Sequence, residues 1–444
     1  MRRLRSGGVL LLLLFLGGVT LSQTTPAEWP GWRGPGRDGL NHQTDWRSDW
    51  PKEGPARLWT AQVGIGFSSC AVAAGRLVTM GHAGGDDGAD TVWCLDALTG
   101  GEKWHYSYSC PLWNREHEGG PASTPTIDGE RVYTLSREGH LFCFQLSNGT
   151  ILWQRNLRAD YQVPPRASEP PRDYGLTGSP LVLGDRLFVE VGGKDSSLVA
   201  LDKLSGKLIW GEGNDGAGYG TPVAFHLAGR QLLATFNLTS LAINDQRNGA
   251  RLGQFPWKTK IGLNAATPLV FDGKVFISSY GMGCALLDLK KGVTSQESGV
   301  SREQKTAFPT RNSQTEICND PNMSIIWQNK ELNSEFAAPV FWQGYIYGFD
   351  YVKLACLDAR DGKVMWKQDG FGRGSVQIAG GKLLIGGENG ELAVAQATAG
   401  GYREICRAKL LPGKVWTIPV LNHGLIYVRN GAGELSCLDV RVQK

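Results

Sequence analysis

The phrase CLDALTGGEKW at residues 94–104 returns as ALDKLSGKLIW at 200–210 and as CLDARDGKVMW at 356–366. Each copy contains an alternating apolar stretch, a Leu-Asp pair, a polar turn with glycine, and a stretch that ends in tryptophan. Alternation with a period of two is typical of β-strands, and glycine permits the positive backbone angles of tight turns. The phrase therefore predicts two antiparallel strands joined by a short turn.

Two further short strands are expected ahead of each phrase. STPTIDGERVYTL from Ser123, GSPLVLGDRLFVEV from Gly178 and ATPLVFDGKVFIS from Ala266 each combine an apolar run, a glycine-containing turn and a second alternating run. This is a hairpin pattern. Four strands in a repeat of roughly 40 to 50 residues are typical of propeller blades. Because eight copies are present, the sequence predicts an all-β, eight-bladed β-propeller with four antiparallel strands per blade.

The two ends of the chain complement each other. The last copy, CLDVRVQK at 437–444, stops before its tryptophan strand, and the segment around Trp59 matches that missing strand. Pairing the two ends would close the ring and remove an exposed sheet edge. We therefore expect a propeller over 57–444 in which an N-terminal strand joins the C-terminal blade.

Two residue types recur at fixed positions of the repeat. Large apolar rings bury much area, so the recurrent tryptophans are expected to fill the space between neighbouring blades; they are Trp59, Trp104, Trp153, Trp210, Trp327 and Trp366. Four recurrent cysteines are expected to be small core residues that do not pair with each other, because equivalent positions lie in different blades; they are Cys94, Cys143, Cys356 and Cys437.

The first residues have the pattern of an export signal. Residues 1–22 contain a basic head, an apolar run over 9–16 and small residues near the predicted cleavage site at Ser22/Gln23. The run is too short for a membrane-spanning helix, which needs about 20 apolar residues. Removal of three arginines with this signal would reduce the formal net charge from +4 to +1. A nearly neutral chain argues against a nucleic-acid partner. We expect a periplasmic or secreted monomer without a transmembrane span.

Two further segments depart from the repeat. Residues 23–56 contain WPGWRGPGRDG at 29–39, where proline and glycine disfavour a helix. We expect an extended N-terminal arm that Trp32 anchors to the propeller surface. The stretch 292–323 is polar and charged, and it is predicted to be an insertion in blade five.

The repeat Leu-Asp-x-x-x-Gly-x-x-x-Trp resembles the quinoprotein repeat. That repeat is found in pyrroloquinoline-quinone (PQQ) dehydrogenases and in the propeller lipoprotein of the outer-membrane β-barrel assembly machinery. WPGWRGPGRDG and the closing WTIPVLNHGLIYVRN at 416–430 look like exported PQQ-like propeller proteins of planctomycete-type bacteria. The resemblance covers about residues 29–444 and implies the propeller fold.

The dehydrogenase branch of that resemblance implies additional chemistry. It implies a quinone over the ring centre, a calcium ion held by acidic and amide side chains, an aspartate base and a disulfide between adjacent cysteines. This sequence has no adjacent cysteines. None of that branch's catalytic residues can be matched to a position here.

A binding funnel is predicted where the connections between blades converge around the central channel. Loops on a rigid scaffold commonly carry function, and a mixture of aromatic, acidic, amide and basic groups suits a small ligand or a peptide. The candidate residues are Phe67, Glu116, His117, Tyr174, Tyr219, Asn264, Glu335, Arg373 and Trp416.

A glycine-rich loop of blade one contains Asp86, Asp87 and Asp90. Three carboxylates could bind calcium through oxygen ligands, but their spacing misses the EF-hand pattern. An ordinary solvated turn is therefore the favoured interpretation, and we expect no metal.

Taken together, these features favour a binding or scaffolding module for a cell-envelope protein, peptide or glycan. In this interpretation the chain has no catalytic residues and needs no cofactor. The alternative is a PQQ-dependent alcohol or sugar dehydrogenase, in which PQQ and calcium would supply the redox chemistry and the ring would orient them.

Overall fold

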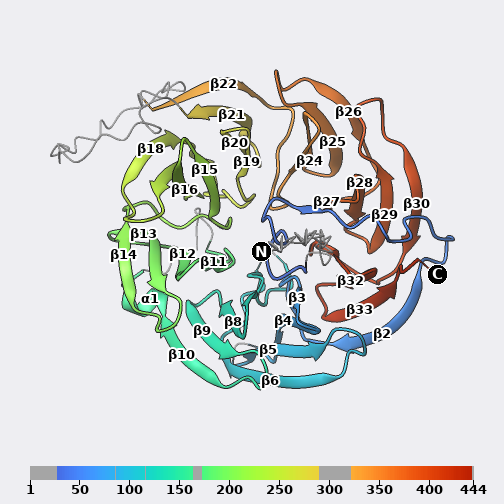
Figure 1. Ribbon diagram of the computed structural model, residues 1–444, viewed down its shortest axis with the longest axis horizontal. Helices are drawn as coiled ribbons and strands as arrows, with labels where there is room; N and C mark the ends of the chain where they lie inside the picture. The colour runs from blue at the N-terminus through green and yellow to red at the C-terminus, as the bar shows by residue number, and fades with distance from the viewer. Residues whose placement is uncertain (1–27, 86, 116, 164–172, 290–321, 443–444) are drawn as a thin grey trace, which may run out of the picture.

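The computed structural model describes residues 28–85, 87–115, 117–163, 173–289 and 322–442. These residues form eight β-sheets arranged as a ring (Figure 1). The predicted signal at 1–22, residues 292–321 of the predicted insertion, Asp86 and Glu116 lie outside the described residues. The prediction of an all-β, eight-bladed propeller is confirmed.

Each blade has four antiparallel strands, which run in order from the channel to the perimeter (Figure 1). Blades one to four comprise β3 Ala71–Ala73, β4 Arg76–Ala83, β5 Ala89–Asp96 and β6 Glu102–Ser109; β7 Thr126–Asp128, β8 Arg131–Leu135, β9 His140–Gln145 and β10 Ile151–Asn156; β11 Leu181–Leu183, β12 Arg186–Gly193, β13 Ser196–Asp202 and β14 Leu208–Glu212; β15 Val223–Leu227, β16 Arg230–Phe236, β17 Ser240–Asp245 and β18 Arg251–Pro256.

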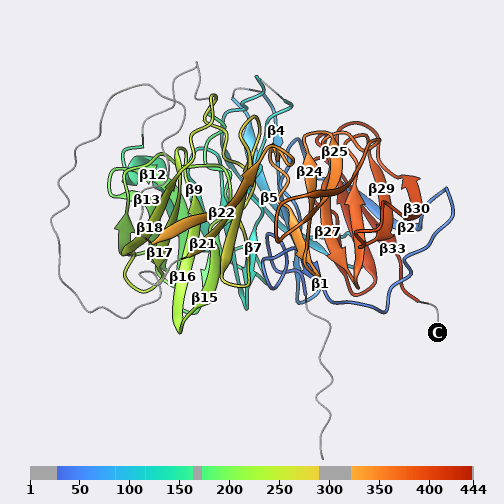
Figure 2. The same cartoon turned by 90° about the horizontal axis from the view of Figure 1, so that it is seen from above.

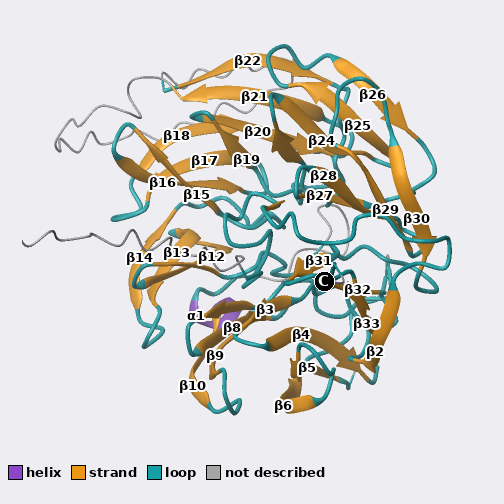
Figure 3. Cartoon of the chain, turned by 45° about the vertical axis from the view of Figure 1, so that its right-hand side comes forward, coloured by secondary structure: helices purple, strands orange, loops and turns teal. Residues whose placement is uncertain are grey.

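Blades five to eight comprise β19 Leu269–Phe271, β20 Lys274–Ser279, β21 Gly283–Leu289 and β22 Met323–Asn329; β23 Val340–Trp342, β24 Tyr345–Asp350, β25 Lys353–Asp358 and β26 Val364–Gln368; β27 Ser375–Ala379, β28 Lys382–Gly386, β29 Glu391–Gln396 and β30 Glu404–Lys409; β31 Val420–Asn422, β32 Leu425–Arg429, β33 Glu434–Asp439 and β2 Ala56–Gln62. The short helix α1, Leu157–Asp160, follows β10, and Figure 3 shows it against a background of strands and loops.

The ring closes as the sequence predicts. Strand β2 pairs antiparallel with β33, and Trp59 lies opposite Cys437. Figure 1 shows the blue β2 outside the red β33, so the outer strand of blade eight comes from the start of the propeller.

The recurrent tryptophans join neighbouring blades at the perimeter. The Trp104 indole N–H donates to the Leu146 carbonyl at 2.8 Å, and its ring covers Gly149 in the same turn. Gly149 has φ +75, and a Cβ there would lie 2.7 Å from that ring. Glycine is therefore needed both for the turn and for the neighbouring tryptophan. The indole–carbonyl pairs are Trp59–Ala97, Trp104–Leu146, Trp153–Lys203, Trp210–Gln246, Trp327–Ala359 and Trp366–Thr398.

Hydroxyl groups join five consecutive blades nearer the channel. Four hydroxyl side chains, each directly before a proline, accept a hydrogen bond from a backbone N–H of the preceding blade. We call these four residues the hydroxyl arc: Thr124, Ser179, Thr221 and Thr267. The donors are the N–H groups of Ser69, Thr124, Ser179 and Thr221, at 3.3, 3.0, 2.9 and 3.2 Å respectively. The hydroxyl residue before each of these prolines therefore links two blades, and the same pair of residues precedes the first strand of its blade.

The N-terminal arm, residues 28–55, first crosses the lower face of the ring in the view of Figure 2 and then continues to the perimeter beside β30 (Figure 1). Its strand β1, Leu40–Asn41, pairs parallel with β27 and makes blade seven five-stranded. Trp29 exchanges two backbone hydrogen bonds with Val72 of β3, at 3.0 and 2.7 Å. Gly34 has φ +77, and a Cβ there would lie 2.6 Å from the Trp29 ring, which explains a glycine of the WPGWRGPGRDG motif.

The hydrophobic core lies between adjacent blades. Apolar clusters combine residues of neighbouring sheets, and the cluster between blades eight and one also contains Trp29 of the arm. Cys94, Cys143, Cys356 and Cys437 are all 0% exposed, and the eight described cysteines carry free thiols, as expected for core residues. Within the described ranges, the structure contains no helix with the length and apolar character that a membrane crossing requires.

Candidate functional site

A cavity of about 540 Å³ lies at the centre of the ring. The connections that precede the inner strands form its walls, and the arm contributes Trp32. The lining residues are Trp32, Phe67, His117, Ala122, Tyr174, Thr177, Ser179, Tyr219, Thr221, Ile261, Leu263, Ala265, Thr267, Tyr280, Glu335, Phe336, Tyr351, Arg373, Trp416 and Thr417.

The structure brings together most of the residues predicted to form a funnel. Seven of the nine line this cavity: Phe67, His117, Tyr174, Tyr219, Glu335, Arg373 and Trp416. Glu116 lies outside the described residues.

The placement of Asn264 in the funnel is wrong. Its side chain is 0% exposed and points into its own connection, where the amide group donates to the carbonyls of Asn237, Leu238 and Trp257. Its Oδ1 accepts from Ser279. A buried amide is retained where such partners satisfy it, and sequence alone does not show whether an amide faces a loop or a cavity.

Three aromatic residues of the cavity come from segments that the sequence analysis did not place in the funnel. Tyr280 and Tyr351 lie in the turns β20–β21 and β24–β25, between the second and third strands of their blades. These turns reach the same face as the blade connections, so their position in the repeat was a usable signal. Trp32 was expected on the propeller surface, but it lies in the central cavity, and its Nε1 donates to Thr267 Oγ1 at 2.9 Å.

Aromatic side chains form a belt on the cavity wall that consists of one run of six neighbouring rings and one separate pair. We call this belt the aromatic collar: Phe67, His117, Tyr174, Tyr219, Tyr280, Phe336, Tyr351 and Trp416. Ring centres of neighbours are 5.3 Å apart for Tyr219–Tyr174, 5.8 Å for Tyr174–His117, 5.3 Å for His117–Phe67, 5.0 Å for Phe67–Trp416, 4.9 Å for Trp416–Phe336 and 5.0 Å for Tyr280–Tyr351. Rings in mutual contact hold one another in place, so the collar is a preformed surface.

One arginine of the wall is shared by two carboxylates. Arg373 Nε lies 3.2 Å from Glu388 Oε1 and its Nη1 lies 3.5 Å from Glu335 Oε2. Burial acts to lower the pKa of Arg373, but the carboxylates of Glu335 and Glu388 outweigh it and the pKa is raised. The guanidinium also lies over the Trp416 ring at 4.7 Å, and Lys414 Nζ lies 4.4 Å from the same ring.

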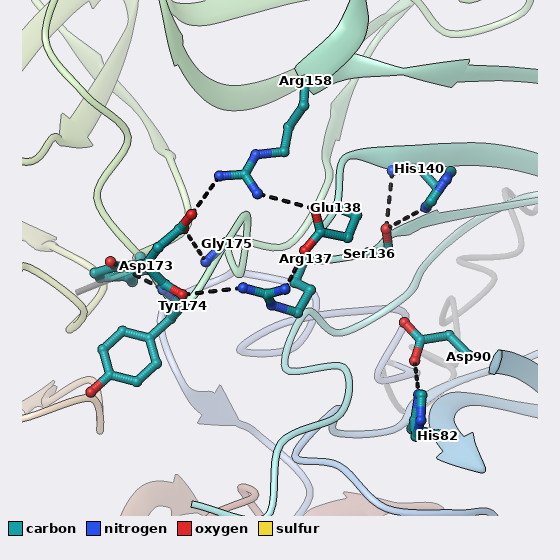
Figure 4. Close-up of polar contacts among 11 residues, drawn as sticks. His82, Asp90, Ser136, Arg137, Glu138, His140, Arg158, Asp173, Tyr174 and Gly175 are labelled. Carbon is teal, nitrogen blue, oxygen red and sulfur yellow. Dashed lines mark hydrogen bonds and ion pairs between the residues drawn. The ribbon is translucent and has the colours of Figure 1, made fainter. Parts of the chain in front are cut away.

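A half-buried ionic network fixes the connection that carries Tyr174 (Figure 4). Arg158 forms ion pairs with Glu138 at 3.1 Å and with Asp173 at 2.8 Å. Arg137 pairs with Glu138 and donates to the Asp173 carbonyl at 3.2 Å. Burial acts to lower the pKa of Arg158, but the carboxylates of Asp173 and Glu138 outweigh it and the pKa is raised. The residue before Tyr174 is therefore held by two arginines.

Known proteins share both the sequence pattern and the fold of this chain. The family described as outer membrane protein assembly factor BamB matches residues 89–320 and 351–443, which is more than half of the chain. The chain belongs to this family. The arm and Trp32 precede the matched ranges.

Individual BamB proteins are distant relatives. Outer membrane protein assembly factor BamB of Moranella endobia (strain PCIT) is 23% identical over 317 residues, which cover 71% of this chain and 74% of that protein. The protein of the same name from Yersinia pestis is 23% identical over 323 residues, which cover 70% and 72%.

Two groups of solved structures share the fold. BamB from Moraxella catarrhalis has a TM-score of 0.59 at 14% identity, with 87% of this chain and 99% of that chain covered. Quinohemoprotein alcohol dehydrogenase ADHIIG from Pseudomonas putida HK5 has a TM-score of 0.60 at 13% identity, with 94% and 81% covered. At these identities the likeness establishes the fold alone.

Asp87 and Asp90, the described carboxylates of the candidate calcium loop, lie in different surroundings. Asp90 is 2% exposed and its Oδ1 lies 2.9 Å from His82 Nδ1 (Figure 4), whereas Asp87 is exposed. Burial raises the pKa of Asp90. Among the described residues, no group of three or more His, Cys, Asp or Glu side chains is placed to hold a metal ion.

Proposed function

We propose that this member of the BamB family is a binding module that receives a segment of a cell-envelope protein in its central cavity. The observation that carries the proposal is the preformed aromatic collar around a cavity of about 540 Å³. This volume is within the range of about 300–1,000 Å³ that is usual for ligand sites. Aromatic side chains are also enriched where proteins bind other proteins.

The cellular setting of the proposal is the periplasm or the cell exterior. It is supported by the export-signal pattern at 1–22 and by the family, which is named for outer-membrane protein assembly. We propose a protein rather than a glycan as the partner because the family is described as an assembly factor for outer membrane proteins.

The cavity does not favour the dehydrogenase alternative. Calcium takes six to eight oxygen ligands, often several carboxylates. Among the described lining residues the only carboxylate is that of Glu335, which is paired with Arg373, and Asn264 faces away from the cavity. The sequence also lacks adjacent cysteines. The residues present therefore do not fit PQQ with calcium, although the fold is shared with alcohol dehydrogenases.

Photo-crosslinking in the native cell tests the proposal. A photoreactive phenylalanine at Tyr280 would stand in the cavity, where the native side chain is 39% exposed. The same group at Leu208, which is 50% exposed on the outer strand β14, is the matched control. We expect an envelope protein to be captured from position 280 and not from position 208.

Two results would count against the proposal. One is capture of the same proteins from both positions, which would indicate contact without a preferred site. The other is capture from position 280 that survives Trp416→Ala unchanged, because the collar would then contribute nothing to binding.

A further inference from the structure

The arm closes one end of the central channel. Besides the Trp29–Val72 bridge to β3, the Pro30 carbonyl accepts from Ile127 N–H of β7 at 2.7 Å, and the Gly39 carbonyl accepts from Ile378 N–H of β27 at 3.0 Å. The arm thus bonds to inner strands in three separate blades on the face opposite the connections (Figure 2). Among the described residues, the arm therefore covers the end of the cavity opposite the connections, which leaves the connection face as the entrance for a ligand.

Trp32 forms part of the pocket on the arm side and is fixed there. Its indole N–H bonds to the Thr267 hydroxyl at 2.9 Å. The next residue, Arg33, is 1% exposed and donates to the Pro339 carbonyl at 2.8 Å and the Asp38 carbonyl at 2.6 Å. A ring that is bonded on one side and flanked by a buried arginine is a rigid surface against which another ring can pack.

The size of the pocket limits what can enter. A volume of about 540 Å³ corresponds to a drug-sized ligand, which excludes a folded domain. The arm also blocks passage of a continuous chain through the ring. The occupant is therefore a short projection from the partner.

The chemistry of the wall selects among such projections. Arg373 and Lys414 already lie over the Trp416 ring, so a further cation gains little from that ring. The remaining surface is aromatic, with the hydroxyls of Ser179, Thr221 and Thr267 on the lining. The bond between the Trp32 indole and Thr267 shows that this hydroxyl arc accepts an indole N–H.

We propose, resting on the function proposed above, that the pocket receives one exposed tryptophan or tyrosine side chain of the partner, which packs against Trp32 inside the aromatic collar. Aromatic pairs gain about 0.5–1.5 kcal/mol beyond the burial of their area, which corresponds to roughly 2- to 13-fold in affinity. Trp32 is then a specificity-determining residue that the arm supplies.

Saturation-transfer NMR with capped tripeptides tests this inference on the full chain. The ligands are acetyl-Gly-Trp-Gly-amide, its Tyr, Leu and Lys counterparts, and the glycan chitotriose. We expect the Trp and Tyr peptides to bind at least threefold more tightly than the Leu and Lys peptides and chitotriose. We expect Trp32→Ala to weaken the Trp peptide about tenfold and Trp32→Phe to retain most of the affinity. Leu204→Ala, in an exposed turn where the native side chain is 56% exposed, is the matched control and should change nothing.

The outcomes separate this inference from the proposed function. If the Leu, Lys or glycan ligand binds as tightly as the Trp peptide, the aromatic specificity is wrong. If Trp32→Ala, shown by circular dichroism to be folded, binds the Trp peptide like the unchanged chain, the role of Trp32 is wrong. Either result leaves the proposed function standing, because that function is tested separately by capture from position 280 and by the dependence of this capture on Trp416.

Discussion

Neighbouring blades are joined by different parts of the chain in two arcs of the ring. Between blades one and five, the hydroxyl arc joins neighbouring blades through residues of the repeat itself. At blade six the corresponding residue is Ala338, which has no hydroxyl, and there the arm's Arg33 bonds to the Pro339 carbonyl. At blades seven and eight the arm adds β1 and the bond from Asn41 Nδ2 to the Leu421 carbonyl at 2.7 Å.

The comparison shows that a distant segment can supply a contact where the repeated hydroxyl is missing, as Arg33 does at blade six. Asn41 and Leu421 are separated by 380 residues, so their bond depends on the completed ring. The hydroxyl contacts, by contrast, join consecutive blades and recur with the repeat. We therefore expect the arm to matter most for closure and the hydroxyl arc to matter locally.

The largest expected effect is that of removing the arm's main anchor. Trp29 is 1% exposed and packs in the cluster between blades eight and one. Trp29→Ala should lower the free energy of unfolding by about 3–5 kcal/mol, as is usual for a buried tryptophan. Trp153→Ala, at a half-buried tryptophan on the perimeter of the arc that the hydroxyl groups join, should cost less. Urea unfolding measures both, and an equal or smaller loss for Trp29→Ala would show that the arm is dispensable for closure.

A medium effect is expected from breaking one link of the hydroxyl arc. Thr221→Val keeps the side-chain shape but leaves the buried Ser179 N–H unpaired, which should cost about 1–3 kcal/mol of unfolding free energy. Thr99→Val in an exposed turn is the matched control and should cost at most about 0.5 kcal/mol. If the two variants lose the same amount, the hydroxyl arc contributes no stability of its own.

A smaller effect tests whether the two arcs are independent. Asn41 bonds to blade eight, whereas Thr221 joins blades three, four and five, so the losses of unfolding free energy in Thr221→Val and Asn41→Ala should add to within about 0.5 kcal/mol. Thr221→Val and Thr267→Val should deviate from additivity by more than that, because Thr221 N–H donates to Thr267. Double-mutant cycles from urea unfolding provide both values, and strong coupling between the arcs would contradict their independence.

The smallest effect concerns thiol reactivity, without a change of fold. Cys406 is half-buried beneath the arm and donates to the Ser48 carbonyl, while Cys94 is 0% exposed. Burial raises the pKa of Cys406 to about 11 and that of Cys94 to about 12, so both thiols are protonated at pH 8. We expect slow reaction of Cys406 with a disulfide reagent and none of Cys94 until unfolding.

The same reaction reports on the arm. In a Cys318→Ser background, which leaves only the thiols that the structure describes, Trp29→Ala should speed the reaction of Cys406 several-fold and leave that of Cys94 unchanged. Mass spectrometry of the labelled peptides identifies the site. Equal acceleration at both cysteines would indicate general loosening of the ring instead.

The fold could be predicted because the same strand pattern and the same tryptophan position recur in successive blades. The tryptophans lie between neighbouring blades, as the repeated phrase predicts, and Trp59 completes the ring. Seven funnel residues were also predictable, since the connections before inner strands must converge on the channel.

The remaining features occur once and depend on tertiary contacts. Neither composition nor periodicity indicates that Trp32 turns into the channel, because its partner Thr267 is 235 residues away. Asn264 has the chemistry of a ligand contact, but its amide is used by three carbonyls of its own surroundings. The position of Tyr280 in the repeat indicates the face on which its turn lies, but it does not show how far that turn reaches over the channel.

The central cavity is tested most directly by the affinity of the envelope protein captured from position 280 for three forms of the chain, measured by calorimetry. Aromatic residues at the centre of an interface commonly contribute about 2 kcal/mol or more, so Trp416→Ala should weaken binding at least about tenfold. Leu208→Ala on the outer strand should bind like the unchanged chain. Unchanged binding by Trp416→Ala together with weakened binding by Leu208→Ala would place the partner on the perimeter and contradict a site in the central cavity.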